Sequence, residues 1–314
     1  MSKNIAFVFP GQGSQSVGML GELAAEHAIV RETFDEASDA LGTDLWTLVS
    51  TGPKDLLDRT ENTQPAMLAA GVAVWRVWNA ANGPQPQWMA GHSLGEFTAL
   101  VCAGSLDFGD AVRLVAHRGR FMQEAVPRGR GAMAAVLGLT DDQVRELCIE
   151  VAGEQVAEPV NFNSPGQVVI AGDTEAVERA IAAATAAGAR RVLPLPVSVP
   201  SHCALMRPAA ENFAVEMAAV EVRAPAIKVL HNVSVGSASG PDEISDLLVR
   251  QLYSPVRWAE TVQCLASEGA SRLLEAGPGK VLSGLTKRID KRLQALAVSD
   301  PKSLAAALEV TQNA

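Results

Sequence analysis

The stretch MAGHSLGEFTAL, residues 89–100, joins a short apolar run to a segment of helical composition. Within it, Gly91, Ser93 and Gly95 fit the pattern G-x-S-x-G. That pattern is typical of a nucleophile elbow, a strained strand-to-helix turn that presents a serine hydroxyl at the positive end of the helix. The glycines are needed because side chains there would collide with the neighbouring strand and helix. The five-residue pattern is common by chance, so its meaning depends on the surrounding segments.

Strands and helices alternate on both sides of this turn. The apolar run at 4–9 predicts a buried first strand, which ends in the glycine-rich turn PGQGSQ at 10–15. Such alternation favours a largely parallel sheet. Further expected elements are a strand at 86–90 and helices at 17–41, 62–81, 94–103 and 107–125.

The middle of the chain changes character after the linker-like PRGRG at 127–131. The expected order there is β-α-β-β-α-β, the ferredoxin-like motif. Its strands are expected at 132–138, 157–163, 166–171 and 190–199, and its helices at 141–152 and 174–187. After VPSHC the helix–strand alternation resumes. The sequence therefore predicts a large α/β lobe into which a small lobe is inserted.

Composition and charge narrow the class of protein. The chain has 314 residues, of which 48% are hydrophobic and 19% charged, as is ordinary for a globular protein. A net charge of −9 gives no support for nucleic acid or an anionic membrane as partner. Four cysteines lie far apart without a CxxC pair, which argues against a zinc site and a disulfide framework. The N-terminal apolar run is too short for a signal peptide or a membrane span, so we expect a cytoplasmic protein.

A serine nucleophile needs a base, because serine at its free pKa is a weak nucleophile. Among five histidines, His27 and His117 are expected to be solvated, and His92 is expected to support the turn. His202 in VPSHCALM and His231 in VLHNVS both remain candidates. A position in a loop between a strand and a helix favours His202 modestly.

Arg118 is an anomaly in the helix expected at 107–125. At about 100° per residue, the other charged side chains of this segment cluster on one face, whereas Arg118 lies between Leu114 and Phe121 on the apolar side. An unpaired buried guanidinium is very costly. Either a structural ion pair satisfies it, or it receives a carboxylate carried by the substrate, which the planar guanidinium can grip with two hydrogen bonds.

Acyl transfer also needs donors for a developing oxyanion. The backbone N–H of Leu94, which follows the serine, is the standard first donor. Because parallel strands end at the same edge of a sheet, the PGQGSQ turn can lie beside the elbow and supply a second N–H from Gln12. GPGK at 277–280 lacks the full spacing of a phosphate-binding loop and is interpreted as a turn into a helix.

Taken together, these residues and their flanking segments resemble the malonyl-CoA:acyl carrier protein transacylase family nearly from end to end. The joint occurrence of the segments in this order is highly specific. They are FVFPGQGSQ (7–15), TQPAML (63–68), GHSLGE (91–96), HRGRFMQ (117–123), NFNSPGQVVIAG (161–172), VSVPSHCALM (197–206), SPVRW (254–258) and EAGPGKVLSGL (275–285).

The resemblance implies a role for each site residue. It implies that Ser93 is the nucleophile and that His202, in preference to His231, is the base. It also implies that Arg118 binds the malonyl carboxylate. The backbone N–H groups of Gln12 and Leu94 are implied to form the oxyanion hole. A carbonyl oxygen of Gln251 is implied to orient the histidine, in place of the usual aspartate. Asn161 and Asn163 are implied to lie near the cleft.

The implied fold is an α/β-hydrolase-like large subdomain, residues 1–128 and 204–314, with a ferredoxin-like small subdomain at 129–203. The implied reaction is ping-pong transfer of malonyl from malonyl-CoA, through a malonyl-serine ester, to the phosphopantetheine thiol of acyl carrier protein in fatty acid synthesis. No metal or other cofactor, no nucleic acid and no membrane is expected, and the chain is expected to be a monomer. An acidic carrier protein would need a basic docking patch, for which the candidates are Arg128 with Arg130, Arg190 with Arg191, and Lys287 with Arg288.

Three alternatives stay open at this point. A serine thioesterase or esterase would use the same elbow, but it would expect an acidic triad member and gives no reason for Arg118. A non-catalytic docking module of a synthase would not need Ser93, His202 and Arg118 together. A transacylase that serves a polyketide pathway is not distinguished from one that serves fatty acid synthesis.

Overall fold

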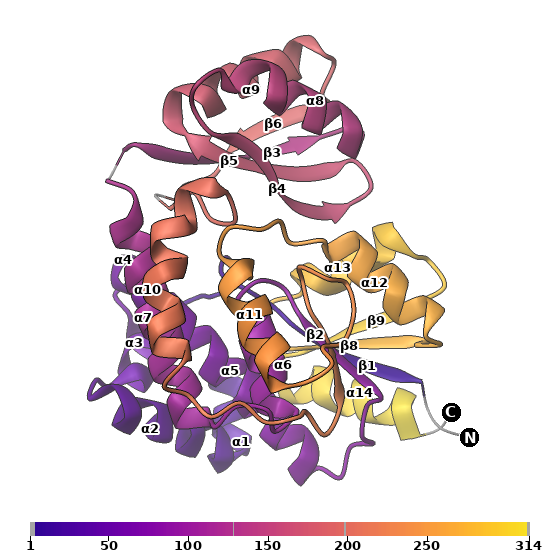
Figure 1. Ribbon diagram of the computed structural model, residues 1–314. Helices are drawn as coiled ribbons and strands as arrows, with labels where there is room; N and C mark the ends of the chain where they lie inside the picture. Colours follow the sequence, from indigo (N-terminus) through magenta and orange to yellow (C-terminus); the bar gives the residue numbers. More distant parts are fainter. Residues whose placement is uncertain (1–3, 128, 198, 313–314) are drawn as a thin grey trace.

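The chain is described by a computed structural model at residues 4–127, 129–197 and 199–312, and its strands form two separate sheets (Figure 1). Within these ranges the larger sheet has five strands, all parallel, in the order β7-β2-β1-β8-β9. Its strands are β1 (Ile5–Phe9), β2 (Trp88–Gly91), β7 (Lys228–Leu230), β8 (Arg272–Ala276) and β9 (Gln294–Val298). The predicted parallel α/β sheet is confirmed.

Apolar residues cover both faces of this sheet because helices pack on each side. Along β1, Ile5, Phe7 and Phe9 point into one cluster, and Ala6 and Val8 point into the other. The helices of this part of the chain are α1 (Gly21–Glu26), α2 (Ala28–Leu41), α3 (Leu45–Thr51), α4 (Lys54–Leu57), α5 (Thr60–Ala80), α6 (Gly95–Cys102), α7 (Phe108–Ala125), α10 (Arg207–Met217), α11 (Pro241–Gln251), α12 (Trp258–Ser267), α13 (Val281–Ile289) and α14 (Pro301–Gln312), with the 3₁₀ turn η1 (Ala204–Met206). Parallel strands buried on both faces are expected to be apolar along their whole length, as β1 is.

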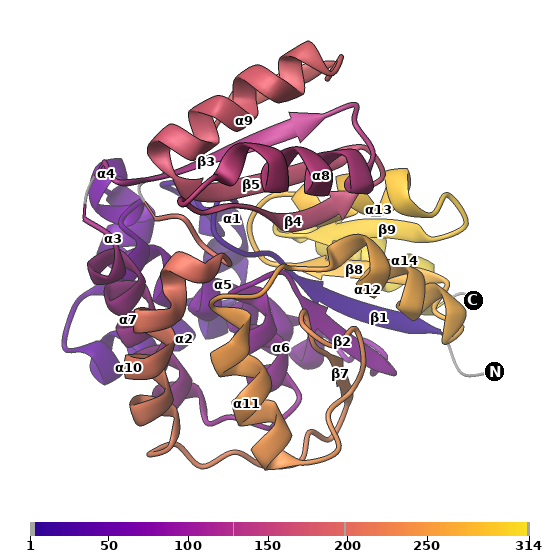
Figure 2. The ribbon, with the colours of Figure 1, turned by 45° about the horizontal axis from the view of Figure 1, so that its top comes forward.

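The smaller sheet has the antiparallel order β4-β5-β3-β6, the strand order of the ferredoxin-like motif predicted for this stretch. Its elements are β3 (Gly131–Leu137), α8 (Asp141–Ala152), β4 (Ala157–Ser164), β5 (Gln167–Asp173), α9 (Thr174–Ala186) and β6 (Arg191–Pro194). Alternate residues divide its faces: Ala134 and Val136 pack with α8 and α9, whereas Met133 and Ala135 pack near Cys203. The sheet therefore turns one face outward to its helices and the other toward the larger lobe (Figure 2).

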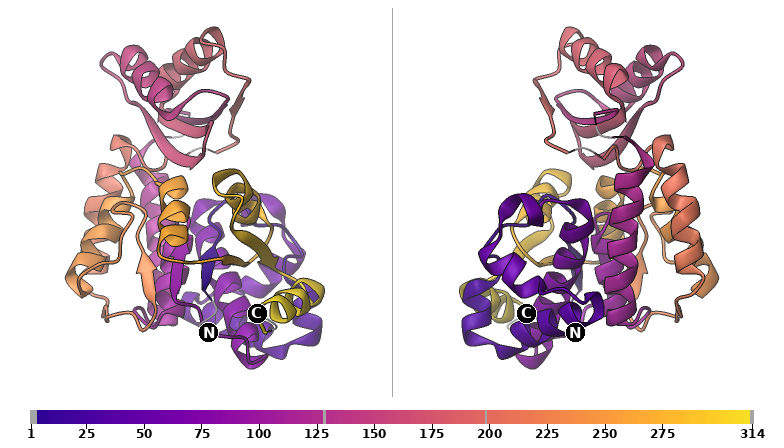
Figure 3. Two further views of the ribbon diagram at one scale, coloured as in Figure 1. Left: turned by 90° about the vertical axis from the view of Figure 1, so that its right-hand side faces the viewer. Right: turned by 90° about the vertical axis from the view of Figure 1, so that its left-hand side faces the viewer.

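The two lobes are joined by the segments on either side of the small sheet. In both side views the small sheet with α8 and α9 stands above the rest of the chain (Figure 3). A parallel bridge between Asn161 of β4 and Val256 adds a further contact between the lobes. Met133 and Asn161 of the small sheet line one cavity with Gln12 and Ser93, so the inner face of this sheet lies over the turns that follow β1 and β2.

Several predicted element boundaries were wrong. The helix expected at 17–41 is two helices, because the backbone at His27 is extended. The helix expected at 62–81 begins earlier, at Thr60, so Pro65 lies inside it. The strand expected at 190–199 stops at Pro194, where Pro194 and Pro196 supply no N–H to a ladder.

Candidate active site

The serine turn lies between β2 and α6 and has a strained backbone. Ser93 has a φ of +53°, in the left-handed region. A Cβ on Gly91 would lie 1.8 Å from the carbonyl carbon of Gly95, and a Cβ on Gly95 would lie 2.0 Å from the carbonyl oxygen of Phe9. Both positions exclude any side chain, which explains why the sequence has glycine there. This is the strand–turn–helix context that the pattern requires.

His202 bridges the serine hydroxyl and a main-chain carbonyl. Its Nε2 lies 2.7 Å from Oγ of Ser93, and its Nδ1 lies 2.7 Å from the backbone oxygen of Gln251, at the end of α11. Because a carbonyl oxygen only accepts hydrogen bonds, Nδ1 carries the proton and Nε2 is left to accept from the hydroxyl. The backbone N–H of His202 donates to the carbonyl of Leu252, which also ties this loop to the end of α11.

The environment of His202 keeps the imidazole neutral. Burial, and after it the positive charge of Arg118, lower the pKa of His202 to about 3, against the opposing effect of the hydrogen bond to Gln251. At neutral pH the ring is therefore uncharged, which is the form that can take a proton from serine.

Arg118 is buried beside the same hydroxyl and has no acidic partner among the described residues. Its side chain, on α7, is 1% exposed. The guanidinium donates to Oε1 of Gln64 at 2.8 Å and to Oε1 of Gln251 at 2.9 Å, and its Nη2 lies 3.5 Å from Oγ of Ser93. Its Nε has no hydrogen-bond partner within the described chain. Burial lowers the pKa of Arg118 to about 10, and the charge of Glu96 opposes that shift, so the group is cationic at neutral pH.

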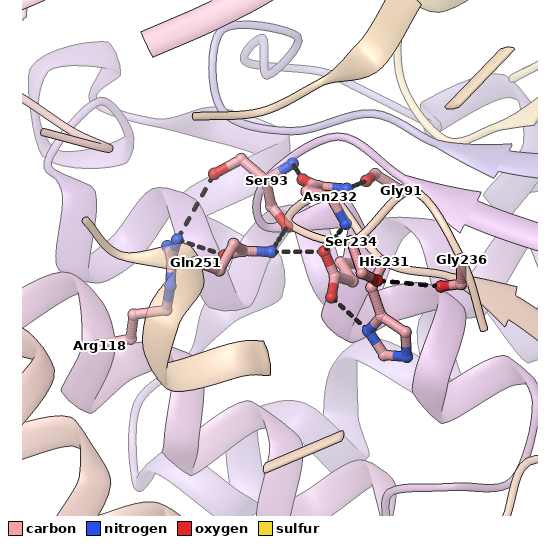
Figure 4. Close-up of polar contacts among 9 residues, drawn as sticks. Gly91, Ser93, Arg118, His231, Asn232, Ser234, Gly236 and Gln251 are labelled. Carbon is pink, nitrogen blue, oxygen red and sulfur yellow. Dashed lines mark hydrogen bonds and ion pairs between the residues drawn. The ribbon is translucent and has the colours of Figure 1, made fainter. Parts of the chain in front are cut away.

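A second layer of buried polar groups lies behind the turn, and the sequence analysis missed it (Figure 4). Oδ1 of Asn232 accepts from the backbone N–H of Ser93 at 2.7 Å, and its Nδ2 donates to the carbonyl of Gly91 at 2.6 Å. His231 lies in this layer, where its Nδ1 is 2.7 Å from Oε1 of Glu96. His231 therefore contacts a carboxylate, whereas His202 contacts the serine.

A cavity opens in front of Ser93 and is lined by both lobes. From the large lobe it is lined by Gln12, Gln64, His92, Ser93, Leu94, Arg118 and Met122, and from the small lobe and the loop after it by Met133, Asn161, Leu195, Val197, Val199, Ser201 and His202. Neither the N–H of Gln12 nor that of Leu94 has a hydrogen-bond partner in the described part of the chain. Both are therefore available to an oxygen atom placed in the cavity.

The two asparagines of β4 differ in their surroundings. Asn161 lines the cavity, and its Oδ1 is buried without a partner among the residues described. Asn163 instead accepts at Oδ1 from Nε2 of His92 at 2.8 Å, which fixes the histidine that precedes the serine. Asn163 therefore contacts the turn through His92 and is not among the residues that line the cavity.

His117 and the candidate docking residues are among the other residues that the sequence analysis considered. His117 lies on α7 and pairs with Glu216 at 2.9 Å, where both side chains are 37% exposed. Arg130, Arg190, Arg191, Lys287 and Arg288 are exposed, and Arg128 lies outside the described residues. In the described ranges no group of three or more His, Cys, Asp and Glu side chains could hold a metal ion, and no helix is long and apolar enough to cross a membrane.

Comparison with known proteins gives one consistent result. The family described as acyl transferase domain matches residues 6–299, a range that includes both lobes. The malonyl CoA-acyl carrier protein transacylase of Escherichia coli strain K12 is 61% identical over 305 residues, which cover 97% of this chain and 99% of that protein. The Bacillus subtilis transacylase is 44% identical, over 98% of this chain and 97% of its own length.

The chain belongs to the malonyl CoA-acyl carrier protein transacylase family. Solved structures of transacylases have the same fold. The crystal structure of malonyl-CoA:acyl carrier protein transacylase from Xanthomonas oryzae pv. oryzae matches with a TM-score of 0.97 at 55% identity and covers 99% of each chain. A malonyl-transacylase in complex with a type II PKS acyl-carrier protein matches with a TM-score of 0.97 at 57% identity, covering 98% of this chain and all of that one.

As a transacylase the chain is an acyltransferase, and its fold is that of the family: a large α/β lobe with a parallel sheet, and a smaller lobe with an antiparallel one. The residues that the sequence analysis missed, Gln64, Glu96 and Asn232, all lie within hydrogen-bonding distance of its central residues. Glu96 carried a detectable signal, since it is a charged residue in an otherwise apolar segment.

Proposed function

We propose that this chain transfers the malonyl group of malonyl-CoA to the phosphopantetheine thiol of acyl carrier protein, through an ester on Ser93. One observation carries the proposal: a buried guanidinium that has no acidic partner among the described residues lies 3.5 Å from the hydroxyl that His202 contacts. Such a group suits an acyl chain that ends in a carboxylate. Membership of the transacylase family supports the same reaction.

In the first half-reaction the two nitrogens of His202 have different tasks. Nε2 takes the proton of Ser93 as Oγ attacks the thioester carbon, and Nδ1 remains hydrogen-bonded to the carbonyl of Gln251. The N–H groups of Gln12 and Leu94 are proposed to hold the oxyanion. The C–S bond then breaks, CoA leaves with the proton from His202, and malonyl remains on Ser93 as an ester.

In the second half-reaction the acceptor thiol replaces CoA. The phosphopantetheine sulfur attacks the ester carbon while His202 takes its proton, and the C–O bond to Ser93 breaks as that proton returns to Oγ. Arg118 is proposed to hold the malonyl carboxylate throughout, and Asn161, with its free buried Oδ1, to contact the substrate in the cleft. The exchange of one thioester for another needs no redox group, so no cofactor is proposed.

We propose the boundaries 1–128 and 204–314 for the large subdomain and 129–203 for the small one. The proposed setting is fatty acid synthesis in the cytoplasm, by a monomeric enzyme. Because one solved relative holds a type II PKS carrier protein, the experiment should compare a fatty-acid carrier protein with a polyketide one. Faster transfer to the polyketide carrier would overturn the fatty acid assignment and leave the chemistry intact.

Release of CoA tests transfer against hydrolysis. With malonyl-CoA and no thiol acceptor, we expect a burst of about one CoA per enzyme and then a slow phase, as accumulation of an acyl-enzyme requires. Addition of the holo carrier protein should restore continuous release and yield the malonylated carrier. Rapid continuous release without an acceptor would instead identify a thioesterase.

A further inference from the structure

A buried carboxylate lies on the far side of Gln251 from Arg118. The side-chain amide of Gln251 accepts from Nη2 of Arg118 at 2.9 Å through Oε1, and it donates to Oε2 of Glu96 at 2.8 Å through Nε2. Arg118 is 1% exposed, and Glu96 and Gln251 are both 0% exposed. The guanidinium and the carboxylate therefore share one buried network, but one amide separates them.

The carboxylate of Glu96 accepts hydrogen bonds from the same layer of buried groups. Its Oε2 accepts from the backbone N–H of Asn232 at 2.9 Å and from Nε2 of Gln251, and its Oε1 lies 2.7 Å from Nδ1 of His231. An uncompensated buried charge is very costly, so a negative charge here offsets the positive charge of Arg118.

A glutamine is well suited to the position between the two charges. An amide accepts on one side and donates on the other without a charge of its own. A carboxylate at residue 251 would pair directly with Arg118 and repel Glu96. The amide also donates to the backbone oxygen of Ser93 at 3.0 Å, so its orientation is fixed from two directions.

We propose that Glu96 is a positioning residue for substrate selection, which acts through the amide of Gln251 to hold Arg118 in place as a compensated cation that no described carboxylate contacts directly. The inference rests on the proposed malonyl transfer. Gln251 then has two separate tasks: its backbone oxygen orients His202, and its side chain keeps the nearest internal carboxylate one amide away from the guanidinium. The carboxylate of the acyl group can form the direct ion pair that the protein itself withholds.

The test compares acylation of Ser93 by malonyl-CoA and by acetyl-CoA, in wild type and three variants. Rapid quenching and intact-protein mass spectrometry measure the two rates. In Gln251→Glu, a carboxylate is placed against Arg118 while the backbone oxygen stays. We expect the malonyl-to-acetyl rate ratio to fall by about tenfold or more, the scale of one lost charge-assisted hydrogen bond.

The other two variants break the link without adding a charge. Glu96→Gln places an NH₂ group among donors, and Gln251→Met removes both side-chain hydrogen bonds. In each of these two variants we expect the malonyl-to-acetyl rate ratio to fall, because Arg118 loses its fixed orientation. If one of the variants does not fold, the other still tests the link from its opposite end.

Glu275→Gln is the matched control for Glu96→Gln. Glu275 is also 0% exposed, but it accepts from the backbone N–H groups of Leu282 and Ser283 and contacts neither Arg118 nor Gln251. We expect it to lower thermal stability and to leave the ratio unchanged. Equal losses with both substrates in all three test variants would overturn the inference, whereas absence of a malonyl ester in wild type would overturn the proposed function instead.

Discussion

The guanidinium of Arg118 lies 3.5 Å from the hydroxyl of Ser93, although 25 positions separate the two residues in the chain. The cation comes from the middle of α7 and the hydroxyl from the turn before α6. The two groups line one cavity, and the proposed function assigns the hydroxyl to the carbonyl end of the acyl group and the guanidinium to its carboxylate end. This relationship links the chemistry of acyl transfer to the choice of acyl group.

Arg118→Ala should separate malonyl transfer from acetyl transfer. Malonyl transfer is expected to lose about 3–5 kcal/mol of transition-state stabilisation, the scale of a broken buried charge pair. Acetyl transfer should lose far less, because acetyl has no carboxylate. Steady-state kcat/KM with both donors measures the difference. Arg76→Ala, which removes an arginine that pairs with Glu36 away from the cavity, is the control. Equal losses on both donors would remove Arg118 from specificity.

The pH dependence should reflect the depressed pKa of His202. The pKa of His202 is about 3 in the folded chain, and the ordinary value is 6.5. Between pH 3 and pH 6.5 the unfolded chain therefore binds a proton at His202, and the folded chain does not. The stability of the fold should therefore fall as pH decreases from 6.5 toward 3. In the pH profile of kcat/KM, the acid limb should likewise lie well below pH 6.5.

Arg118→Ala should also move that acid limb. Burial is the larger cause of the shift and remains, but the charge of Arg118 is the second cause and is removed. We expect the limb in acetyl transfer to move to higher pH in the variant. A limb at the same pH in both proteins would show that the two groups do not interact.

The glycines of the turn should tolerate no side chain. In Gly95→Ala the added Cβ would lie 2.0 Å from the carbonyl oxygen of Phe9, so the turn cannot form as observed. We expect loss of acylation and a lower melting temperature. Gly284→Ala is the control, since nothing lies within 4 Å of its Cβ in α13. That change should stabilise the helix by up to about 1 kcal/mol. Full activity of Gly95→Ala would contradict the close packing of the elbow.

Asn232→Ala should weaken the elbow from behind. It leaves the N–H of Ser93 and the carbonyl of Gly91 without their partner, at a cost of about 1–3 kcal/mol for each group that stays buried and unsatisfied. Chemical denaturation measures the stability. A fully stable and active Asn232→Ala protein would mean that β2 and α6 hold the turn without this residue.

Charge reversal should locate the carrier-protein surface. Arg191 is the first residue of β6 and Arg190 precedes it, and both are exposed. Changing both to Glu is expected to raise the KM for an acidic carrier protein and to leave the KM for malonyl-CoA unchanged. The pair Lys287 and Arg288 on α13 is tested in the same way. A pair that alters both KM values equally does not act in docking.

Local patterns predicted the parts of the site that depend on local geometry. The two glycines and the serine predicted the elbow because their spacing is a steric requirement of one turn. Arg118 could be identified because the helical period assigns each residue to a face of the helix, and Arg118 falls on the apolar face. The same reasoning applies to Glu96, which lies among apolar residues in α6.

The long-range partners could not be predicted from the residues alone. Asn232 reaches Ser93 across 139 positions, and nothing in its neighbours distinguishes it from a surface asparagine. The choice between His202 and His231 was equally long-range, and a family resemblance was needed to make it. Gln251 shows a further difficulty: its bond to His202 uses the backbone oxygen, which every residue type has, so the identity of its side chain gives no sign of the contact. The structure leaves the side chain of Gln251 for Arg118 and Glu96.

The most direct test of the central claim is intact-protein mass spectrometry after brief exposure to malonyl-CoA, followed by peptide mapping. The account predicts one malonyl group per chain, attached to Ser93 and transferable to a holo carrier protein, and no such adduct in Ser93→Ala. An adduct of equal amount in Ser93→Ala, or a wild-type chain that stays unmodified while malonyl-CoA is consumed, would contradict it.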